Sequence, residues 1–223
     1  MDNLPALEIE ELTEGIYLHK SYKHFKDWGL LSSNGLVAIK NNNAFIIDTP
    51  WSTRDTKQLV SWIKEKGFNV IGSVSTHSHE DRTAGIEWLN QQGIPTYASD
   101  LTNSLLESKS KSKATHSLAG DTNLLANGLV ETFYPGAGHA VDNMVVWIPS
   151  LKLLYGGCLL RSIEAKGMGY TGEADMQQWP HSVEKVLARY GEARWVIPGH
   201  GPYGDIEILN HTLTLAKASA SKE

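Results

Sequence analysis

The chain contains one cysteine, Cys158, in 223 residues. A single cysteine excludes a disulfide within the chain and leaves the thiol available to a metal ion, whatever the compartment. No apolar run is long enough to cross a bilayer, so no membrane partner is expected. The chain also lacks low-complexity or linker-like segments, and its 41% hydrophobic residues suffice for one substantial core. These features predict a single domain over residues 1–223.

Basic residues form no long run in the sequence. The net charge is −5, the sequence pI is about 6.0, and no basic run carries interleaved aromatic residues. This composition disfavours nucleic acid as a partner or substrate. The short lysine-rich stretch 109–113 is predicted to be a solvated loop.

The segment from Thr76 to Arg82 contains an HxHxD motif directly after an apolar, strand-like run. Alternate residues of an extended segment point to the same side, so His77 and His79 can reach one metal ion while Asp81 points toward a second. By itself the motif is a moderate signal, because neighbouring histidines are often surface residues or buried hydrogen-bonding groups. The spacing permits a two-metal site.

Three further residues of metal-ligand type, His139, Cys158 and His200, each stand beside glycine just past an apolar run. Glycine allows a close backbone approach, which is needed where several strand ends direct side chains at one point. Taken singly, each histidine has a competing interpretation as a turn residue, and Cys158 as a small buried apolar residue. The repetition at successive strand ends favours one shared metal centre.

Hydrophobic periodicity predicts strands and helices alternating in both halves of the chain, as two sheets covered by outer helices require. Ser52 or Thr53 is expected to cap the first helix, and Gly67 to end it. Strands are predicted around residues 15–18, 36–39, 44–48, 70–75, 130–133, 144–147, 151–155 and 195–197, and helices over about 57–66, 82–90, 99–108, 176–190 and 205–218.

The order HxHxD, Gly-His, Gly-Gly-Cys and Pro-Gly-His resembles that of the class B metallo-β-lactamases of the first subclass, in particular the acquired imipenemase-like branch. The similarity extends over almost the whole chain. The other segments that resemble this family are Ile16–His19, Phe45–Pro50, Gly85–Leu89, Ile94–Ala98 and Asp142–Trp147.

The resemblance implies an α/β fold, the αββα sandwich, with two mixed sheets flanked by helices. It implies two Zn²⁺ ions per chain and hydrolysis of the β-lactam amide bond of penicillins, cephalosporins and carbapenems by a hydroxide that bridges the metals. Such an enzyme gives antibiotic resistance and is expected to be a monomer. The implied ligands are His77, His79 and His139 for one ion, and Asp81, Cys158 and His200 for the other.

Arg82 follows Asp81, where many hydrolases of the wider superfamily carry a histidine. A guanidinium stays protonated and cannot bind a metal, so the second site needs a softer anionic ligand, and the thiolate of Cys158 suits zinc. This departure favours the lactamase subgroup over glyoxalase-like or nuclease-like relatives. Asp81 is expected to orient the hydroxide and is a candidate for proton delivery to the leaving nitrogen, with a water at the second metal as the alternative.

Substrate contacts follow from the same resemblance. Arg161 stands three positions after the cysteine, where the family commonly has a lysine, and is expected to bind the β-lactam carboxylate; a solvated surface role is the alternative. Tyr170 stands where many relatives have an asparagine near the carbonyl oxygen. Trp28 resembles the apolar tip of a mobile hairpin, with a core role as the alternative.

Asp48 ends a predicted strand and is expected to support Arg82 or Cys158 from behind the metal ligands, while plain turn capping competes with that role. Two other functions remain open. The first is a thioester or lactone hydrolase of the same superfamily. The second is a non-catalytic zinc-binding module, which would have no open coordination position for water.

The sequence begins with Met1 and polar residues rather than with the charged and apolar regions of a signal peptide. Because the resembled family is usually exported, we interpret Met1 as a start codon placed where a signal peptide was removed. The expected native location is then the periplasm, with a cytosolic protein as the alternative.

Overall fold

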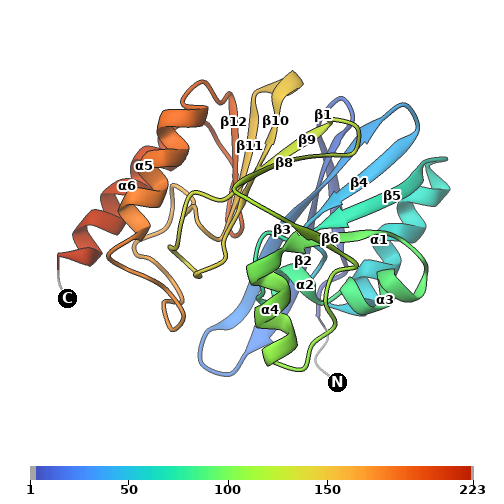
Figure 1. Cartoon of the computed structure of the whole chain (residues 1–223), viewed down its shortest axis with the longest axis horizontal. Coiled ribbons are helices and arrows are strands. Elements are labelled where there is room, and N and C mark those ends of the chain that lie inside the picture. Colours follow the sequence, from blue (N-terminus) through green and yellow to red (C-terminus); the bar gives the residue numbers. More distant parts are fainter. Residues whose placement is uncertain (1–3, 222–223) are drawn as a thin grey trace. The chain divides into compact units, whose positions relative to one another are not determined.

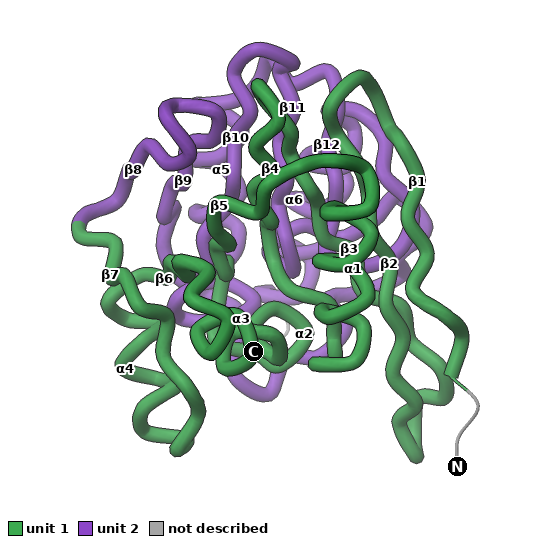
Figure 2. The backbone as a smooth tube through the Cα atoms, turned by 90° about the vertical axis from the view of Figure 1, so that its right-hand side faces the viewer, with its two compact units in different colours: residues 1–119 green, residues 120–223 purple. Residues whose placement is uncertain are grey.

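The computed structural model describes residues 4–221. Met1, on which the start-codon interpretation rests, lies outside the described residues. The backbone divides into two compact units, the first ending at Ala119 and the second beginning at Gly120 (Figure 2). Each unit has its own sheet and is described by itself below, while the expectation of a single domain stays a prediction.

The first unit contains a seven-stranded mixed sheet with its strands in sequence order. The first four strands pair antiparallel and the remaining pairs are parallel. Parallel β4 and β5 end at the same edge of the sheet, which brings the residues after both strands together. The strands are β1 (Glu8–Thr13), β2 (Ile16–Phe25), β3 (Gly29–Lys40), β4 (Asn43–Ile47), β5 (Asn69–Val74), β6 (Thr96–Ser99) and β7 (His116–Leu118).

Four helices connect the parallel strands of this unit: α1 (Thr53–Glu65), α2 (Glu80–Thr83), α3 (Ile86–Gln91) and α4 (Asp100–Ser108). Helix α1 contacts β5, and the two lie near each other in Figure 1. The apolar face of α1 is buried in a cluster with residues of β3 and β4. Burial of this face, rather than helix propensity alone, stabilises α1.

Ser52 is the residue that caps α1. It has an extended backbone, and its hydroxyl oxygen accepts a hydrogen bond from the backbone N–H of Asp55 at 3.1 Å. Gly67 follows the end of the helix with φ +85°, and its N–H donates to the carbonyl of Lys64 at 2.9 Å. The predicted start and stop of this helix are therefore confirmed, with Ser52 rather than Thr53 as the cap.

The helix predicted over residues 82–90 is wrong as a single element, because it is broken into α2 and α3. The break falls at Gly85, whose N–H donates to Thr49 Oγ1 at 3.0 Å. A Cβ at Gly85 would lie 2.5 Å from Thr56 Oγ1 of α1. The chain therefore needs glycine where it approaches α1, and this tertiary contact overrides the helical pattern.

The β2–β3 hairpin is much longer than the short strands predicted around residues 15–18 and 36–39. Its ladder runs without interruption from the pair Ile16 and Ala38 to the pair Phe25 and Gly29. The outer half carries many polar side chains, so hydrophobic alternation does not reveal it. Backbone hydrogen bonding extends the hairpin regardless of that polarity.

The second unit contains a five-stranded mixed sheet in the order β12-β11-β10-β9-β8. Strands β11 and β12 are parallel and the other pairs are antiparallel. The elements are β8 (Thr122–Leu125), β9 (Val130–Phe133), β10 (Val145–Ile148), a 3₁₀ turn η1 (Pro149–Leu151), β11 (Leu153–Gly157), α5 (Trp179–Tyr190), β12 (Trp195–Pro198) and α6 (Glu207–Ala220).

Helices α5 and α6 pack against each other, as the orange and red ribbons of Figure 1 show, and α6 contacts β12. The fully buried Trp179 begins α5, and its indole N–H donates to the carbonyl of Leu159 at 2.8 Å. The expected fold class, two mixed sheets flanked by helices, is confirmed. Within residues 4–221, the structure contains no helix of the length and apolarity that a membrane span requires.

We expect Ser52→Ala to lower the free energy of unfolding by about 1 kcal/mol, because the N–H of Asp55 loses its acceptor. Urea titration followed by circular dichroism measures this change. Ser61→Ala is the matched control, since Ser61 is exposed in the interior of the same helix and alanine is the better helix former there. Equal stability of Ser52→Ala and the wild type would show that this cap contributes nothing.

Candidate metal centre

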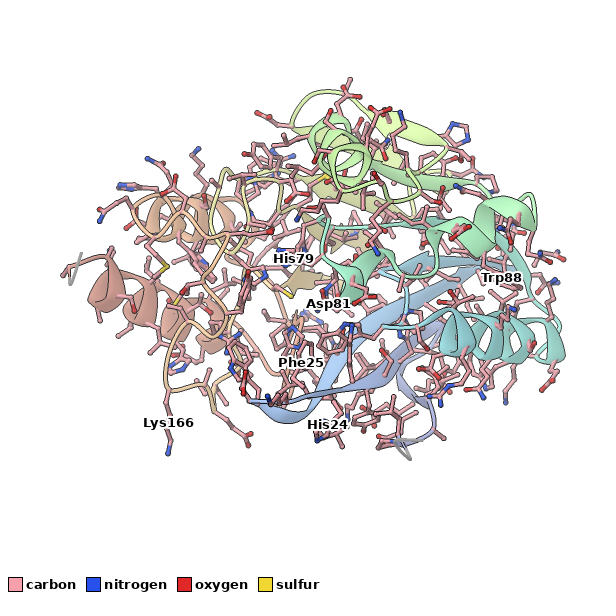
Figure 3. All side chains as sticks on the ribbon, turned by 90° about the horizontal axis from the view of Figure 1, so that it is seen from below. His24, Phe25, His79, Asp81, Trp88 and Lys166 are labelled. Atoms are coloured by element: carbon pink, nitrogen blue, oxygen red, sulfur yellow. The ribbon has the colours of Figure 1, made fainter. Side chains whose placement is uncertain are left out.

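The structure brings His77, His79 and Asp81 together in the first unit. One potential ligand atom from each lies within 4.8 Å of the others. The imidazole rings of His77 and His79 meet edge to face with centroids 4.6 Å apart. His79 still has an extended backbone, and α2 begins directly after it, so the chain turns between His79 and Asp81, which are both labelled in Figure 3.

Asp48, at the end of β4, supports this segment from the neighbouring strand. Its backbone adopts φ +58°, and its carboxylate accepts from the N–H and the hydroxyl of Thr76, at 2.7 and 2.8 Å. The Thr76 hydroxyl also lies 3.4 Å from Nδ1 of His77. Asp48 therefore fixes the turn that leads into the motif, which is the role the turn-capping interpretation proposed.

Asp48 also contacts Arg82, as the other interpretation proposed. The side chain of Arg82 is fully buried, with Nη1 3.4 Å from Asp48 Oδ2 and Nη2 2.8 Å from Asp81 Oδ2. Nη1 donates in addition to the carbonyl of Asn34 at 2.5 Å. Two carboxylates thus balance one buried cation, and the guanidinium holds one oxygen of Asp81 in place.

His19 is a residue that sequence reasoning missed. It is buried in β2, with Nε2 3.0 Å from the carbonyl oxygen of Asp48. Burial lowers the pKa of His19 to about 3, and the charge of Arg82 acts in the same direction, while the bond to Asp48 opposes it. A neutral His19 therefore donates to the strained Asp48 turn. A lone histidine in a strand gives no sign of such a partner.

In the second unit, Cys158 and His200 meet at one edge of the sheet. They follow the parallel strands β11 and β12, and Sγ of Cys158 lies 3.3 Å from Nε2 of His200. The N–H of Gly199 donates to the carbonyl of Gly157 at 2.7 Å, and Gly157 adopts φ +52°. The glycines beside these two ligand candidates therefore allow the close approach that the sequence suggested.

His139 lies in the loop between β9 and β10, where it is buried against the indole of Trp179 with ring centroids 5.7 Å apart. The Asn143 side chain fixes this loop: it accepts from the N–H of Ala140 at 3.0 Å and donates to the carbonyl of Gly136 at 2.8 Å. These contacts order the loop that carries His139.

The three substrate-contact candidates have different surroundings. Trp28 is 54% exposed between β2 and β3, so the core alternative for it is wrong. Tyr170 is 45% exposed in the segment between β11 and α5. Arg161 is half-buried, and its Nε donates to the carbonyl of Gly167 at 3.2 Å, so its side chain is held rather than freely solvated. Their roles toward substrate stay predictions.

Each of the two mixed sheets thus carries, after its strands, side chains of the types that bind zinc, which is typical of a metal-binding α/β protein. Comparison with known proteins gives the family. The family model described as "Metallo-beta-lactamase superfamily" matches residues 28–200. A "Metallo-beta-lactamase type 2" of Pseudomonas aeruginosa is 43% identical over 94% of this chain and 84% of its own length.

Solved structures agree over nearly the whole chain. The TMB-1 structure has a TM-score of 0.96 and 54% identity, covering 97% of this chain and 100% of that one. A structure of DIM-1 metallo-beta-lactamase exposed to ceftazidime has a TM-score of 0.96 and 55% identity, covering 97% and 99%. The chain belongs to the metallo-beta-lactamase superfamily.

We expect Asp48→Asn to lower the free energy of unfolding by roughly 3 kcal/mol, because it leaves the buried Arg82 with one carboxylate partner instead of two. Denaturant titration measures the change. Asp27→Asn removes an exposed carboxylate from the hairpin turn and is expected to change stability by less than about 0.5 kcal/mol. Similar effects of the two substitutions would contradict a structural role for the Asp48 charge.

His19 predicts a loss of stability in acid. Its pKa is about 3 in the folded protein against an ordinary value of 6.5, so between these values only the unfolded chain binds the proton. The contribution of neutral His19 to the free energy of unfolding is therefore complete above pH 6.5. It declines by up to about 1.4 kcal/mol per pH unit as the pH falls toward 3. Between pH 3 and 6.5 we expect His19→Asn to take up about one proton fewer on unfolding than the wild type, seen as a shallower slope of the free energy of unfolding against pH. Parallel curves for the two proteins would refute this assignment.

Proposed function

We propose that this protein hydrolyses the amide bond of β-lactam antibiotics, carbapenems included, with two zinc ions bound per chain. The observation that carries the proposal is the gathering of three donors in the HxHxD segment and of Cys158 with His200 at a second strand edge. Family membership over most of the chain supports it.

The donor chemistry fits zinc. Imidazole nitrogen, carboxylate oxygen and a cysteine thiolate are the ligands that zinc takes in proteins, whereas magnesium and calcium prefer oxygen alone. The 4.8 Å separation within the HxHxD group is short enough for one ion to be reached by several of its atoms. We assign His77, His79 and His139 to one ion, and Asp81, Cys158 and His200 to the other.

Zinc, when bound, lowers the pKa of a water ligand to about 7 and polarises a carbonyl oxygen. The side chains supply orientation. Arg82 holds one oxygen of Asp81 at 2.8 Å, which fixes the carboxylate, and Asp81 then orients a nucleophile or carries a proton toward the leaving nitrogen. Three protein ligands per ion leave positions open for water and substrate, which argues against a purely structural module.

The substrate itself would be bound by three further residues. Arg161 pairs with the β-lactam carboxylate, Trp28 covers an apolar substituent from the hairpin, and Tyr170 contacts the substrate near its carbonyl oxygen. The exposure of Trp28 and Tyr170 supports these roles, since about half of each side chain reaches the solvent. Arginine offers paired donors that the lysine common in relatives lacks, so substrate preference is expected to differ from theirs.

We further propose that the protein acts as a monomer in the periplasm and gives resistance to β-lactams. Usual export of the resembled family supports this location, and a chain with one cysteine is compatible with an oxidising compartment. Light scattering of the purified protein and fractionation of cells that express the full gene test the two statements separately. A stable dimer, or retention in the cytoplasm, would overturn the corresponding one.

The function is tested by hydrolysis of a carbapenem and a chromogenic cephalosporin, with zinc present and after chelation. We expect turnover that the chelator abolishes and added zinc restores. No turnover by a folded protein that contains two zinc ions would refute the proposal and would favour a thioester or lactone substrate. Turnover that survives complete removal of metal would refute the zinc assignment.

Cys158→Ser tests the ligand assignment. Serine keeps the size of the side chain but does not supply a thiolate, so we expect one zinc ion to be lost and kcat/KM to fall by at least about a hundredfold. Metal content by mass spectrometry accompanies the kinetics. Ser162→Ala is a control, because its hydroxyl belongs to the same segment without being an assigned ligand. Full zinc content in Cys158→Ser would contradict the assignment.

A further inference from the structure

Arg161 is held by helix α6 through its backbone. The hydroxyl of Thr212, buried in α6, accepts from the N–H of Arg161 at 2.8 Å and lies 3.2 Å from its carbonyl oxygen. The position of the Arg161 Cα is therefore set by a helix of the packed core. What remains to be fixed is the long side chain, which would otherwise sample many rotamers.

The loop of residues 162–172 follows Arg161 and is itself anchored. Met168 is only 5% exposed and belongs to the apolar cluster of the second unit. Nε2 of His211 in α6 lies 2.8 Å from the carbonyl of Ala165. Lys166, labelled in Figure 3, lies between these two anchors and is exposed. The loop thus presents a fixed backbone to the Arg161 side chain.

The guanidinium lies against Gly169 in this loop. A Cβ at Gly169 would be 2.8 Å from Nη1 and 3.0 Å from both Cζ and Nη2 of Arg161, and Gly169 adopts φ +73°. On the same side chain, Nε donates to the carbonyl of Gly167. Because this Cβ position is almost equally far from Cζ and both terminal nitrogens, it lies over the face of the guanidinium, and a side chain there would displace the group from its present orientation.

The favourable charge interaction of the Arg161 guanidinium is with Cys158, an assigned zinc ligand, and not with a carboxylate. Among residues 4–221 the structure pairs no carboxylate with Arg161, although the guanidinium is half-buried and remains charged. With Nε bound to Gly167, the terminal N–H groups are the donors left for an anion. A planar guanidinium in a fixed orientation can bind a carboxylate through two parallel hydrogen bonds.

We propose that Gly169 is a positioning residue for substrate recognition: by lacking a side chain it lets the Arg161 guanidinium lie flat on the loop and fixes the direction of its N–H donors toward the β-lactam carboxylate. This inference rests on the proposed function. It assigns specificity to a residue that does not itself touch the substrate.

The test compares steady-state kinetics of three single variants on a chromogenic cephalosporin with the carboxylate beside the ring. We expect Gly169→Ala to raise KM about tenfold with kcat within about twofold, because binding rather than chemistry is lost. Gly128→Ala has the same left-handed strain, at φ +78°, but nothing within 4 Å of the new Cβ. Gly120→Ala is a second control, at φ +70° and also with open space around the Cβ. Both controls are expected to keep the wild-type KM.

A double-mutant cycle separates positioning from a general disturbance of the loop. Arg161→Ala alone should raise KM by at least as much as Gly169→Ala, and adding Gly169→Ala to it should then change KM less than twofold. Arg161→Lys should relieve part of the defect of Gly169→Ala, because a flexible ammonium avoids the clash. Binding of the hydrolysed cephalosporin, measured by calorimetry, is expected to weaken in parallel with KM.

The outcomes are distinguishable from failure of the proposed function. If the wild type, loaded with zinc, does not hydrolyse the cephalosporin, the proposed function fails. If the wild type is active and Gly169→Ala retains its KM, or raises KM equally in the Arg161→Ala background, the positioning role is wrong. Should Gly169→Ala not fold, Gly169→Asn replaces it, since asparagine tolerates positive φ and still carries the Cβ.

Discussion

The buried guanidinium of Arg82 is the charge on which the metal-ligand segment depends. A cation with no exposed surface is costly unless carboxylates and carbonyls surround it, and here Asp48, Asp81 and the carbonyl of Asn34 do so. Asp48 in turn binds the backbone and hydroxyl of Thr76, directly before His77. One charge network therefore connects the strand that carries Asp48 with both ends of the HxHxD motif.

This arrangement explains why the ligand candidates are well ordered by protein contacts alone. The Thr76 hydroxyl lies beside Nδ1 of His77 and the guanidinium of Arg82 binds Asp81, so neighbouring protein groups position both residues. His19 extends the same support to the carbonyl of Asp48, whose positive φ would otherwise be strained. A preorganised ligand set loses less entropy when the metal binds, and it favours a defined geometry.

The second unit achieves order by a different route, through glycine and backbone contact. Gly157 and Gly199 let two parallel strands end close enough for Cys158 and His200 to meet. Gly169 permits the guanidinium of Arg161 to lie on the loop backbone. In both places the absence of a side chain on glycine determines where a functional side chain lies. This role of glycine cannot be inferred from the chemistry of each residue taken singly.

The sequence by itself determined the alternation of strands and helices, the end of α1, a choice of two residues for its cap, and the candidate donors, because periodicity, helix-end residues and ligand spacing are local signals. Only the tertiary structure decided the break at Gly85, the length of the β2–β3 hairpin, the exposure of Trp28, and the partners of Arg82, His19 and Arg161. Each of these depends on which residues distant in sequence face one another. Burial and charge compensation are properties of such contacts, so no local pattern in the chain encodes them.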